Sequence, residues 1–230
     1  TTPMISPRIR AVGIVTLWTL ASIHGSGAFA QFDQKPRGME PTRVLKEHTK
    51  FVWGVAFSPD GKSIASAGED LAILWDIATG KPTFRLEPAE GVSSSHRVAF
   101  SPDGKLLASG SADGVVKVWQ LASNAAARTL TAHAKAVRAL AYSPNGQQLA
   151  SAGEDRSMKL WRIDPNAEPL TTEHPGDVGA LAYSPSGGLL VSAGLDGALQ
   201  TWDAATGKSQ GVFTKHTGAV TVLVFQAGRG

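Results

Sequence analysis

The sequence of 230 residues contains no cysteine and no large excess of charge of one sign. Without cysteine the chain has no disulfides, no thiolate nucleophile, no cysteine-based zinc site and no attachment motif for c-type haem. The formal net charge is only +3, from 22 basic and 19 acidic residues. No stripe of lysine and arginine follows the chain, and a nucleic-acid partner normally requires one. We therefore predict that the chain has no nucleic-acid partner.

A long apolar run is also missing. The longest such run, residues 11–23, has about 13 residues, whereas a membrane-spanning helix needs about 20. The run follows Arg8 and Arg10 and precedes small residues at 28–30. This order is typical of a secretory signal peptide that is cleaved before Gln31. Removal of the two arginines would lower the net charge from +3 to +1.

The remaining composition is that of an ordinary globular domain, with 42% hydrophobic and 18% charged residues. We therefore expect a signal helix within residues 1–30, a linker at 31–41 and a folded domain at 42–230. The signal predicts a secreted or periplasmic protein, of bacterial type. The alternative is that the N-terminal segment is retained and anchors the protein to a membrane, facing the periplasm.

What the sequence does contain is a turn that recurs at an almost fixed interval. Ser-Pro-Asp-Gly at 58–61 returns at 101–104, then as Ser-Pro-Asn-Gly at 143–146 and Ser-Pro-Ser-Gly at 184–187. A period of roughly 42 residues indicates a propeller or a solenoid. Period-two apolar patterns bounded by Pro, Gly, Asp and Asn surround each turn and predict antiparallel hairpins.

Each repeat also carries a serine, an aspartate and a tryptophan in the same order, and most have a histidine upstream. These residues are His48, Ser66, Asp70 and Trp75; Ser109, Asp113 and Trp119; His133, Ser151, Asp155 and Trp161; and His174, Ser192, Asp196 and Trp202.

On these motifs, residues 42–225 resemble the WD-repeat family of β-propellers. The resemblance implies an all-β fold of four-stranded antiparallel blades, in which four complete blades are flanked by half-blade strands at 42–47 and 220–225. The expected repeats are about 48–90, 91–132, 133–173 and 174–215, with a fifth that begins at 216. Relatives usually close seven blades, so we expect a partial gene product or a subunit that completes its ring with another chain. Open strand edges also predict self-association.

In this family the histidine, serine, aspartate and tryptophan of a blade form a buried hydrogen-bonded network, and the resemblance gives the residues listed above that structural role. The third and fourth repeats carry all four residue types. The second has Gly91 in place of the histidine, and in the first Asp70 lies five residues before Trp75 instead of six. A one-residue change reverses which side chains face the core, unless a bulge absorbs it.

The histidines do not form an obvious catalytic set. All except His24 and His96 occupy the repeat's own histidine position, and one remaining histidine makes neither a triad nor a metal site. We predict no catalytic residue, no metal and no cofactor. The alternative is that the chain is the binding portion of a larger propeller enzyme, whose other blades supply the chemistry.

The resemblance also implies a binding face. Partners of the family commonly contact positions three and five residues after the histidine, and the residue before the aspartate. The candidate partner-binding residues are therefore Phe51, Trp53, Glu69, His96, Arg138, Glu154 and Asp177. Aromatic and arginine side chains anchor interfaces most often, although Phe51 and Trp53 also suit packing between blades. We predict a non-catalytic scaffold with a protein partner, or alternatively a membrane-tethered accessory subunit.

Overall fold

The computed structural model describes residues 44–86, 95–123, 125–162, 167–214 and 216–225. These residues contain no helix and form four four-stranded sheets, each built from four consecutive antiparallel strands. The all-β architecture expected from the repeats is confirmed. The segments 1–30 and 31–41 lie outside the described residues, and so does the expected signal helix.

Each sheet is one blade, with its strands paired in chain order. The strands are β1 (Val52–Phe57), β2 (Ser63–Gly68), β3 (Ala72–Asp76) and β4 (Pro82–Leu86) in blade one; β5 (Ser95–Phe100), β6 (Leu106–Ser111), β7 (Val115–Gln120) and β8 (Ala125–Thr131) in blade two; β9 (Val137–Tyr142), β10 (Gln148–Gly153), β11 (Ser157–Arg162) and β12 (Leu170–Glu173) in blade three; and β13 (Val178–Tyr183), β14 (Leu189–Gly194), β15 (Leu199–Asp203) and β16 (Ser209–Phe213) in blade four.

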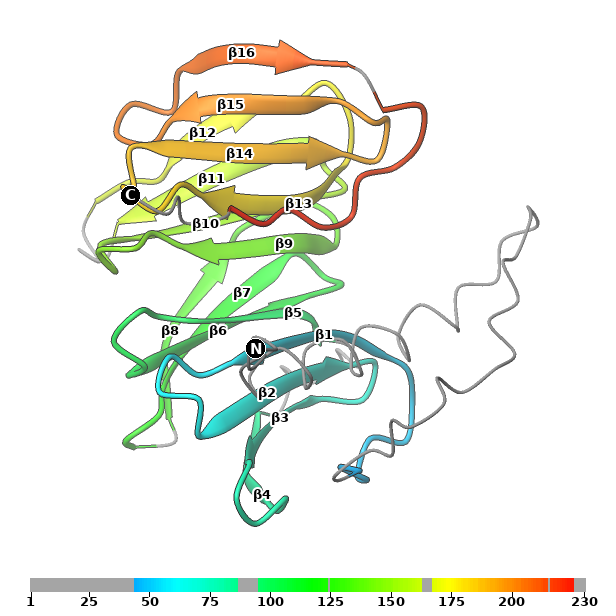
Figure 1. Ribbon diagram of the computed structural model, residues 1–230, viewed down its shortest axis with the longest axis vertical. Coiled ribbons are helices and arrows are strands. Elements are labelled where there is room, and N and C mark those ends of the chain that lie inside the picture. The colour runs from blue at the N-terminus through cyan, green and yellow to red at the C-terminus, as the bar shows by residue number, and fades with distance from the viewer. Residues whose placement is uncertain (1–43, 87–94, 124, 163–166, 215, 226–230) are drawn as a thin grey trace, which may run out of the picture.

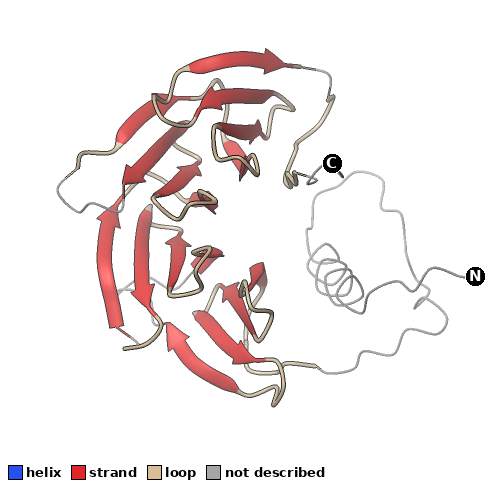
Figure 2. Cartoon of the chain, turned by 60° about the vertical axis from the view of Figure 1, so that its left-hand side comes forward, coloured by secondary structure: helices blue, strands red, loops and turns tan. Residues whose placement is uncertain are grey.

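The blades follow one another around a common centre as an open arc (Figure 2). The first strand of each blade is the innermost one, and β1, β5, β9 and β13 lie next to one another in that order (Figure 1). All four first strands run in the same direction, so their beginnings lie on the same face of the arc. The loops that contain the histidines therefore share one face of the molecule.

The core lies between the blades. Three apolar clusters each join two neighbouring blades. In the first, Ala65 and Ala67 of β2 pack against Leu107 and Trp119 of blade two. The small alanines allow one sheet to approach the large side chains of the next, and full burial of such a large side chain stabilises the fold by roughly 1.5–3 kcal/mol.

The Ser-Pro-x-Gly turns close the first hairpin of each blade. The Ser58 hydroxyl donates to Asp60 at 2.7 Å and accepts from the Ser63 N–H at 2.8 Å. Gly61 adopts a φ of 69°, which glycine tolerates without strain. The turns also stack, because a Cβ on Gly104 would lie 3.6 Å from Cδ of Pro59 in the preceding turn.

The shorter hairpin of blade one does not reverse its strands. Ser66 pairs with Ile73 and Ile64 with Trp75, just as Ser109 pairs with Lys117 and Leu107 with Trp119 in blade two. The missing residue is taken out of the turn between β2 and β3, where the Gly68 N–H donates to the Leu71 carbonyl. The register relative to the tryptophan is therefore the same in both blades.

The two expected half-blade strands are not present. Residues 44–47 and 220–225 are not assigned to any strand, and 42–43 lie outside the described residues. A single extended segment needs a neighbouring strand to complete its backbone hydrogen bonds. The Val220 N–H instead donates to the Gly194 carbonyl at 3.3 Å.

Candidate functional site

Blades one and three contain continuous hydrogen-bonded networks. In blade one Trp75 Nε1 lies 2.8 Å from Ser66 Oγ, Ser66 Oγ lies 2.6 Å from His48 Nε2, and His48 Nδ1 lies 2.7 Å from Asp70. An indole nitrogen only donates and a carboxylate only accepts. The tryptophan N–H therefore donates at one end of the network, and the histidine Nδ1–H donates to the aspartate at the other.

Blade three repeats this arrangement with deeper burial. Trp161 donates to Ser151 at 2.9 Å, Ser151 lies 2.8 Å from His133 Nε2, and His133 Nδ1 lies 3.0 Å from Asp155. Burial lowers the pKa of His133, although the carboxylate of Asp155 partly opposes this shift. Burial also acts against ionisation of Asp155, but His133 and nearby N–H groups outweigh it and lower the pKa of Asp155.

In blade one the backbone adds to the same effect. Burial alone would raise the pKa of Asp70, but hydrogen bonds from His48 and from the N–H groups of Thr49 and Leu71 lower it to about 2. The Thr49 N–H, next to the histidine, is 2.7 Å from Asp70. The residue that follows the histidine therefore helps to hold the aspartate ionised.

Blade two has only part of the network. Trp119 donates to Ser109 at 2.9 Å. Asp113 accepts from the Ser111 hydroxyl and, at 3.1 Å, from the Val115 N–H within its own turn. Gly91, which replaces the histidine, lies outside the described residues. The aspartate of this blade is therefore used by the turn.

The expectation of a complete network in blade four is wrong. Trp202 donates to Ser192 at 2.8 Å, but His174 Nδ1 lies 2.9 Å from the carbonyl of Gly176 instead of reaching Asp196. His174 Nε2 is buried and has no hydrogen-bond partner among the described residues. The physical reason is Pro175, which has no N–H to donate to the aspartate as its counterparts in blades one and three do.

Three of the candidate binding residues lie at irregularities of the inner strands. The pairing of each first strand with its second strand skips one residue. The skipped residues are Trp53, His96, Arg138 and Gly179. A bulge of this kind re-aims a side chain, so each blade presents one residue near the start of its inner strand. We name this end of the blades, with its histidine loops, the histidine-loop face.

Three aromatic rings follow one another along this face. The rings of Phe51 and Trp53 are 6.2 Å apart, and those of Trp53 and His96 are 5.8 Å apart. Phe51 is 50% exposed, while His96 is 9% exposed. Trp53 is half-buried. The structure therefore brings together three of the predicted residues, with Phe51 presented to solvent.

Arginines surround the buried end of this row. Arg138 donates to Glu154 through Nε at 2.8 Å. Arg97 donates through one nitrogen to the carbonyls of Trp53 at 2.9 Å and His96 at 2.8 Å. Burial, Arg138 and Arg97 together lower the pKa of His96 to about 4, against the opposing effect of Glu154. His96 is therefore a neutral imidazole at neutral pH.

Of the remaining predicted residues, Asp177 lies apart from this row and Glu69 lies beside it. Asp177 faces Arg156 of the neighbouring blade, with 3.5 Å between Oδ1 and Nε. The backbone N–H of Glu69 donates to the Phe51 carbonyl at 2.9 Å, which places Glu69 beside the aromatic end of the row. Glu154 belongs to the row through its ion pair with Arg138.

The sequence prediction missed Arg97. The same repeat position holds Gly54, Ala139 and Ala180 in the other blades, so an arginine among small residues was the available signal. A Cβ on Gly54 would lie 3.0 Å from the His96 carbonyl and 3.7 Å from Cδ of Arg97. The glycine therefore makes room for the arginine to cross from one inner strand to the next.

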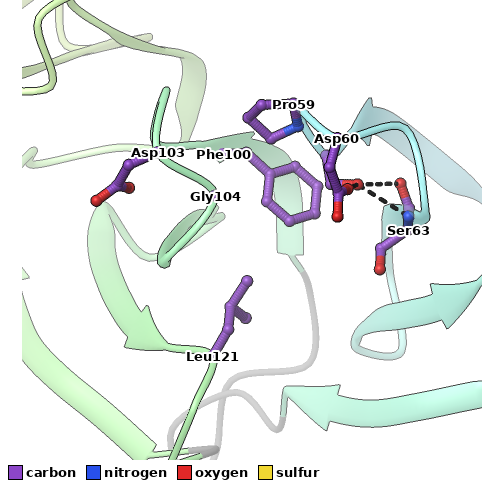
Figure 3. A pocket seen from close by; sticks show the side chains of 8 residues that line it. Pro59, Asp60, Ser63, Phe100, Asp103, Gly104 and Leu121 are labelled. Atoms are coloured by element: carbon purple, nitrogen blue, oxygen red, sulfur yellow. Dashed lines mark hydrogen bonds between the residues drawn. The ribbon is translucent and has the colours of Figure 1, made fainter.

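A pocket of about 380 Å³ lies at the opposite end of the blades, between the turns of blades one and two. Figure 3 shows the Phe100 ring in the middle of this pocket, with Asp60 on one side and Asp103 on the other. Both carboxylates accept hydrogen bonds inside their own turns, from Ser58 and Ser101. They serve the turns, so the pocket offers no free acid or base pair.

Neither metal ligands nor a membrane span emerge from the part of the chain that the structure describes. No three histidine or acidic side chains gather there as a metal site would require. None of its elements is a helix of the length and apolarity that crossing a bilayer demands.

Comparison with known proteins gives a family match. The family profile described as "WD domain, G-beta repeat" matches residues 39–76, 81–120, 125–162 and 167–203, which together are about two thirds of the chain. A solved structure of U3-55K superposes with a TM-score of 0.68 and 31% sequence identity over 77% of this chain and 56% of the other. The WD40 repeats of RRP9 give the same TM-score and identity, over 55% of their length.

Three curated relatives align with a shorter segment. The small ribosomal subunit proteins RACK1 of Brassica napus and RACK1z of Arabidopsis thaliana are each 33% identical over 94 residues, which is 40% of this chain. WD repeat-containing protein 1 of Xenopus tropicalis is 35% identical over 92 residues, or 37% of this chain. The aligned part spans only 28% of the two plant proteins and 14% of the frog protein.

These relatives contradict the expected location. Two of them are ribosomal subunit proteins, and ribosomes work inside the cell. The prediction of a secreted or periplasmic protein is therefore wrong. The relatives come from plants and a frog, so the comparison does not support a bacterial origin either.

Proposed function

Because the chain belongs to the WD-repeat family, we propose that it is a non-catalytic scaffold that binds a protein partner on its histidine-loop face. The observation that carries this proposal is the row of bulged residues. Trp53, His96 and Arg138 come from three different blades and lie at one end of adjacent inner strands. Aromatic and arginine side chains are the residues that most often dominate the energy of a protein interface.

The histidines support a role without catalysis. His48 and His133 are engaged in hydrogen bonds that tie serine to aspartate within a blade. His174 contacts a backbone carbonyl. His96 is buried beside two arginines, and no carboxylate accepts a hydrogen bond from it among the described residues. In blades one and three the serine, histidine and aspartate stand in the order of a nucleophile, a base and an orienting acid, but Ser66 and Ser151 are 6% and 0% exposed and each accepts the N–H of a tryptophan. Burial keeps these hydroxyls away from a substrate, which supports a structural role.

Self-association is a second kind of contact that we retain as a proposal. Val212 and Phe213 on β16 are 51% and 56% exposed. Leu86 on β4 occupies the position in blade one that Phe213 occupies in blade four. Its exposed fraction is only 1%, because blade two covers it. The corresponding face of blade four therefore carries apolar side chains that suit contact with another sheet.

The proposed function is tested by partner capture. The purified chain and its Trp53→Ala and Arg138→Ala variants are immobilised and exposed to cell extract that still contains ribosomes. We expect both variants to lose at least one partner, since truncation of an interface anchor costs roughly 2 kcal/mol or more. Arg162→Ala, which removes an exposed arginine at the end of β11, is the matched control.

Two results would count against this function. One is unchanged capture by both variants while their circular dichroism spectra match that of the unaltered chain. The other is capture that nuclease treatment of the extract abolishes. The predicted absence of a nucleic-acid partner is thereby tested in the same experiment.

A further inference from the structure

The charges of the histidine-loop face do not balance where the three bulges meet. His96 lies within the electrostatic reach of Arg97, Arg138 and Glu154. Glu154 forms an ion pair with Arg138. Arg97 has hydrogen bonds to two backbone carbonyls, and no carboxylate forms an ion pair with it among the described residues. One positive charge is therefore left over in a half-buried position.

The unsatisfied polar atoms at the same place have a common requirement. Trp53 Nε1 and His96 Nδ1 are both buried and have no hydrogen-bond partner within the described chain. An indole nitrogen can only donate, and a guanidinium can only donate. An orphaned buried donor is unfavourable until it finds an acceptor. Trp53 Nε1 and the Arg97 guanidinium therefore call for an acceptor, whereas His96 Nδ1 donates or accepts according to its tautomer. The surplus charge favours an acceptor that is negative.

The surroundings favour a protein side chain as the source of that acceptor. Phe51 is the most exposed member of the ring row, 6.2 Å from Trp53, and provides an apolar contact beside the polar one. Glu69 lies next to Phe51 through its backbone bond. Binding of a nucleic-acid backbone uses several basic side chains, whereas among the described residues here Arg138 is already paired with Glu154 and Arg97 is the cation without a carboxylate. One unpaired cation suits a single acidic side chain.

We propose that the partner places the carboxylate of an aspartate or glutamate side chain against Arg97, Trp53 and His96. Phe51 contacts an apolar side chain next to that acid in the same extended segment. The proposal rests on the proposed function and names the chemistry of its partner. The carboxylate supplies the counter-charge of Arg97 and an acceptor for Trp53 Nε1, and this step requires the indole to rotate so that its buried nitrogen reaches the surface.

The experiment uses an array of immobilised synthetic heptapeptides of varied sequence. Every peptide with a central Glu or Asp has a twin with Gln or Asn, so each pair differs only in the charge. The full chain is labelled and applied at low salt. We expect the acidic members to bind about tenfold better than their twins, because a charge-assisted hydrogen bond is roughly twice as strong as a neutral one. The preference falls as salt is raised.

Variants locate the effect. Arg97→Gln is expected to bring the acidic and amide twins to equal binding. Trp53→Phe keeps an aromatic ring but removes the indole N–H, and it is expected to reduce the preference for acidic peptides severalfold. With two variants the test does not depend on the folding of either one. Arg162→Gln removes the same charge from the exposed end of β11 and is expected to leave the preference unchanged.

Equal binding of twins by the unaltered chain would overturn the proposal, and so would a preference that survives both Arg97→Gln and Trp53→Phe. Arg97-dependent binding of a uridine oligoribonucleotide in place of the acidic peptides would show that the anion is a phosphate of RNA and would overturn it as well. None of these results alters the capture experiment, whose readout is loss of a partner from Trp53→Ala. The two proposals therefore fail separately.

Discussion

The buried serines offer a direct measurement of what the histidine contributes to a blade. Ser151 and Ser192 are both 0% exposed, and each accepts a hydrogen bond from the tryptophan of its blade, at 2.9 and 2.8 Å. They differ in the second partner. Ser151 lies 2.8 Å from His133 Nε2, whereas the histidine of blade four faces a backbone carbonyl. The second partner of Ser192 is the Gln200 carbonyl at 3.5 Å, so the same change to alanine removes a short second hydrogen bond only in blade three.

The expected magnitudes follow from the groups left without a partner. Ser151→Ala leaves both the Trp161 N–H and the His133 ring nitrogen unpaired. Ser192→Ala leaves the Trp202 N–H unpaired and otherwise removes only the long 3.5 Å bond to the Gln200 carbonyl. Each orphaned buried group costs about 1–3 kcal/mol. We expect Ser151→Ala to lower the free energy of unfolding by about 1–3 kcal/mol more than Ser192→Ala does. For a chain of this size 1 kcal/mol corresponds to roughly 2–4 °C in Tm.

The measurement is urea denaturation followed by tryptophan fluorescence and by circular dichroism. The two variants are compared with a common dependence of the unfolding free energy on urea concentration, so that a difference in the urea midpoint reports a difference in stability alone. Equal destabilisation by the two substitutions would refute the reasoning, because it would mean that the serine–histidine bond contributes nothing. A larger loss of stability in Ser192→Ala than in Ser151→Ala would refute this reasoning more strongly.

Two further predictions concern histidines that do not complete a network. Pro175→Ala supplies an N–H toward Asp196 like that of Thr49 toward Asp70. We expect the free energy of unfolding to rise by about 1 kcal/mol, since a hydrogen bond to a charged group outweighs the lost rigidity of proline. An unchanged urea midpoint would contradict this account, and so would an Ala134→Pro variant that is as stable as the unaltered chain. Burial, Arg138 and Arg97 lower the pKa of His96 from 6.5 to about 4, against the opposing effect of Glu154. The unfolded chain therefore binds the proton more tightly than the folded one, and the free energy of unfolding should fall as the pH drops from about 6.5 to 4. NMR titration of the His96 ring measures the pKa directly, and His96→Gln should flatten that part of the stability profile; a ring that titrates near 6.5 would disprove it.

Much of the fold could be predicted from the sequence because its signals are local and repeated. The Ser-Pro-x-Gly turns satisfy their own hydrogen bonds within six residues, as Ser58 and Ser63 show. Alternating apolar residues fix which side of each strand faces a neighbouring blade. Four copies of the pattern make an accidental match very improbable, so the blades and their order followed directly.

The candidate site was only partly predictable. The spacing from the histidine located Trp53 and Arg138, because each blade has a bulge at the same position. It did not locate Arg97, which acts by donating to carbonyls on its own strand and on the strand of another blade. It also failed for the network of blade four, where residue types were present but one missing N–H turned the ring away.

The sequence by itself determined the repeating blade, its turns and the residue types at each repeat position, because these depend on contacts between residues close along the chain. The tertiary structure decided which of those residues meet. The Trp53–His96 ring contact and the crossing of Arg97 both depend on a neighbouring blade that lies alongside. Contacts between blades join residues about one repeat apart, and a pattern within one repeat carries no record of them.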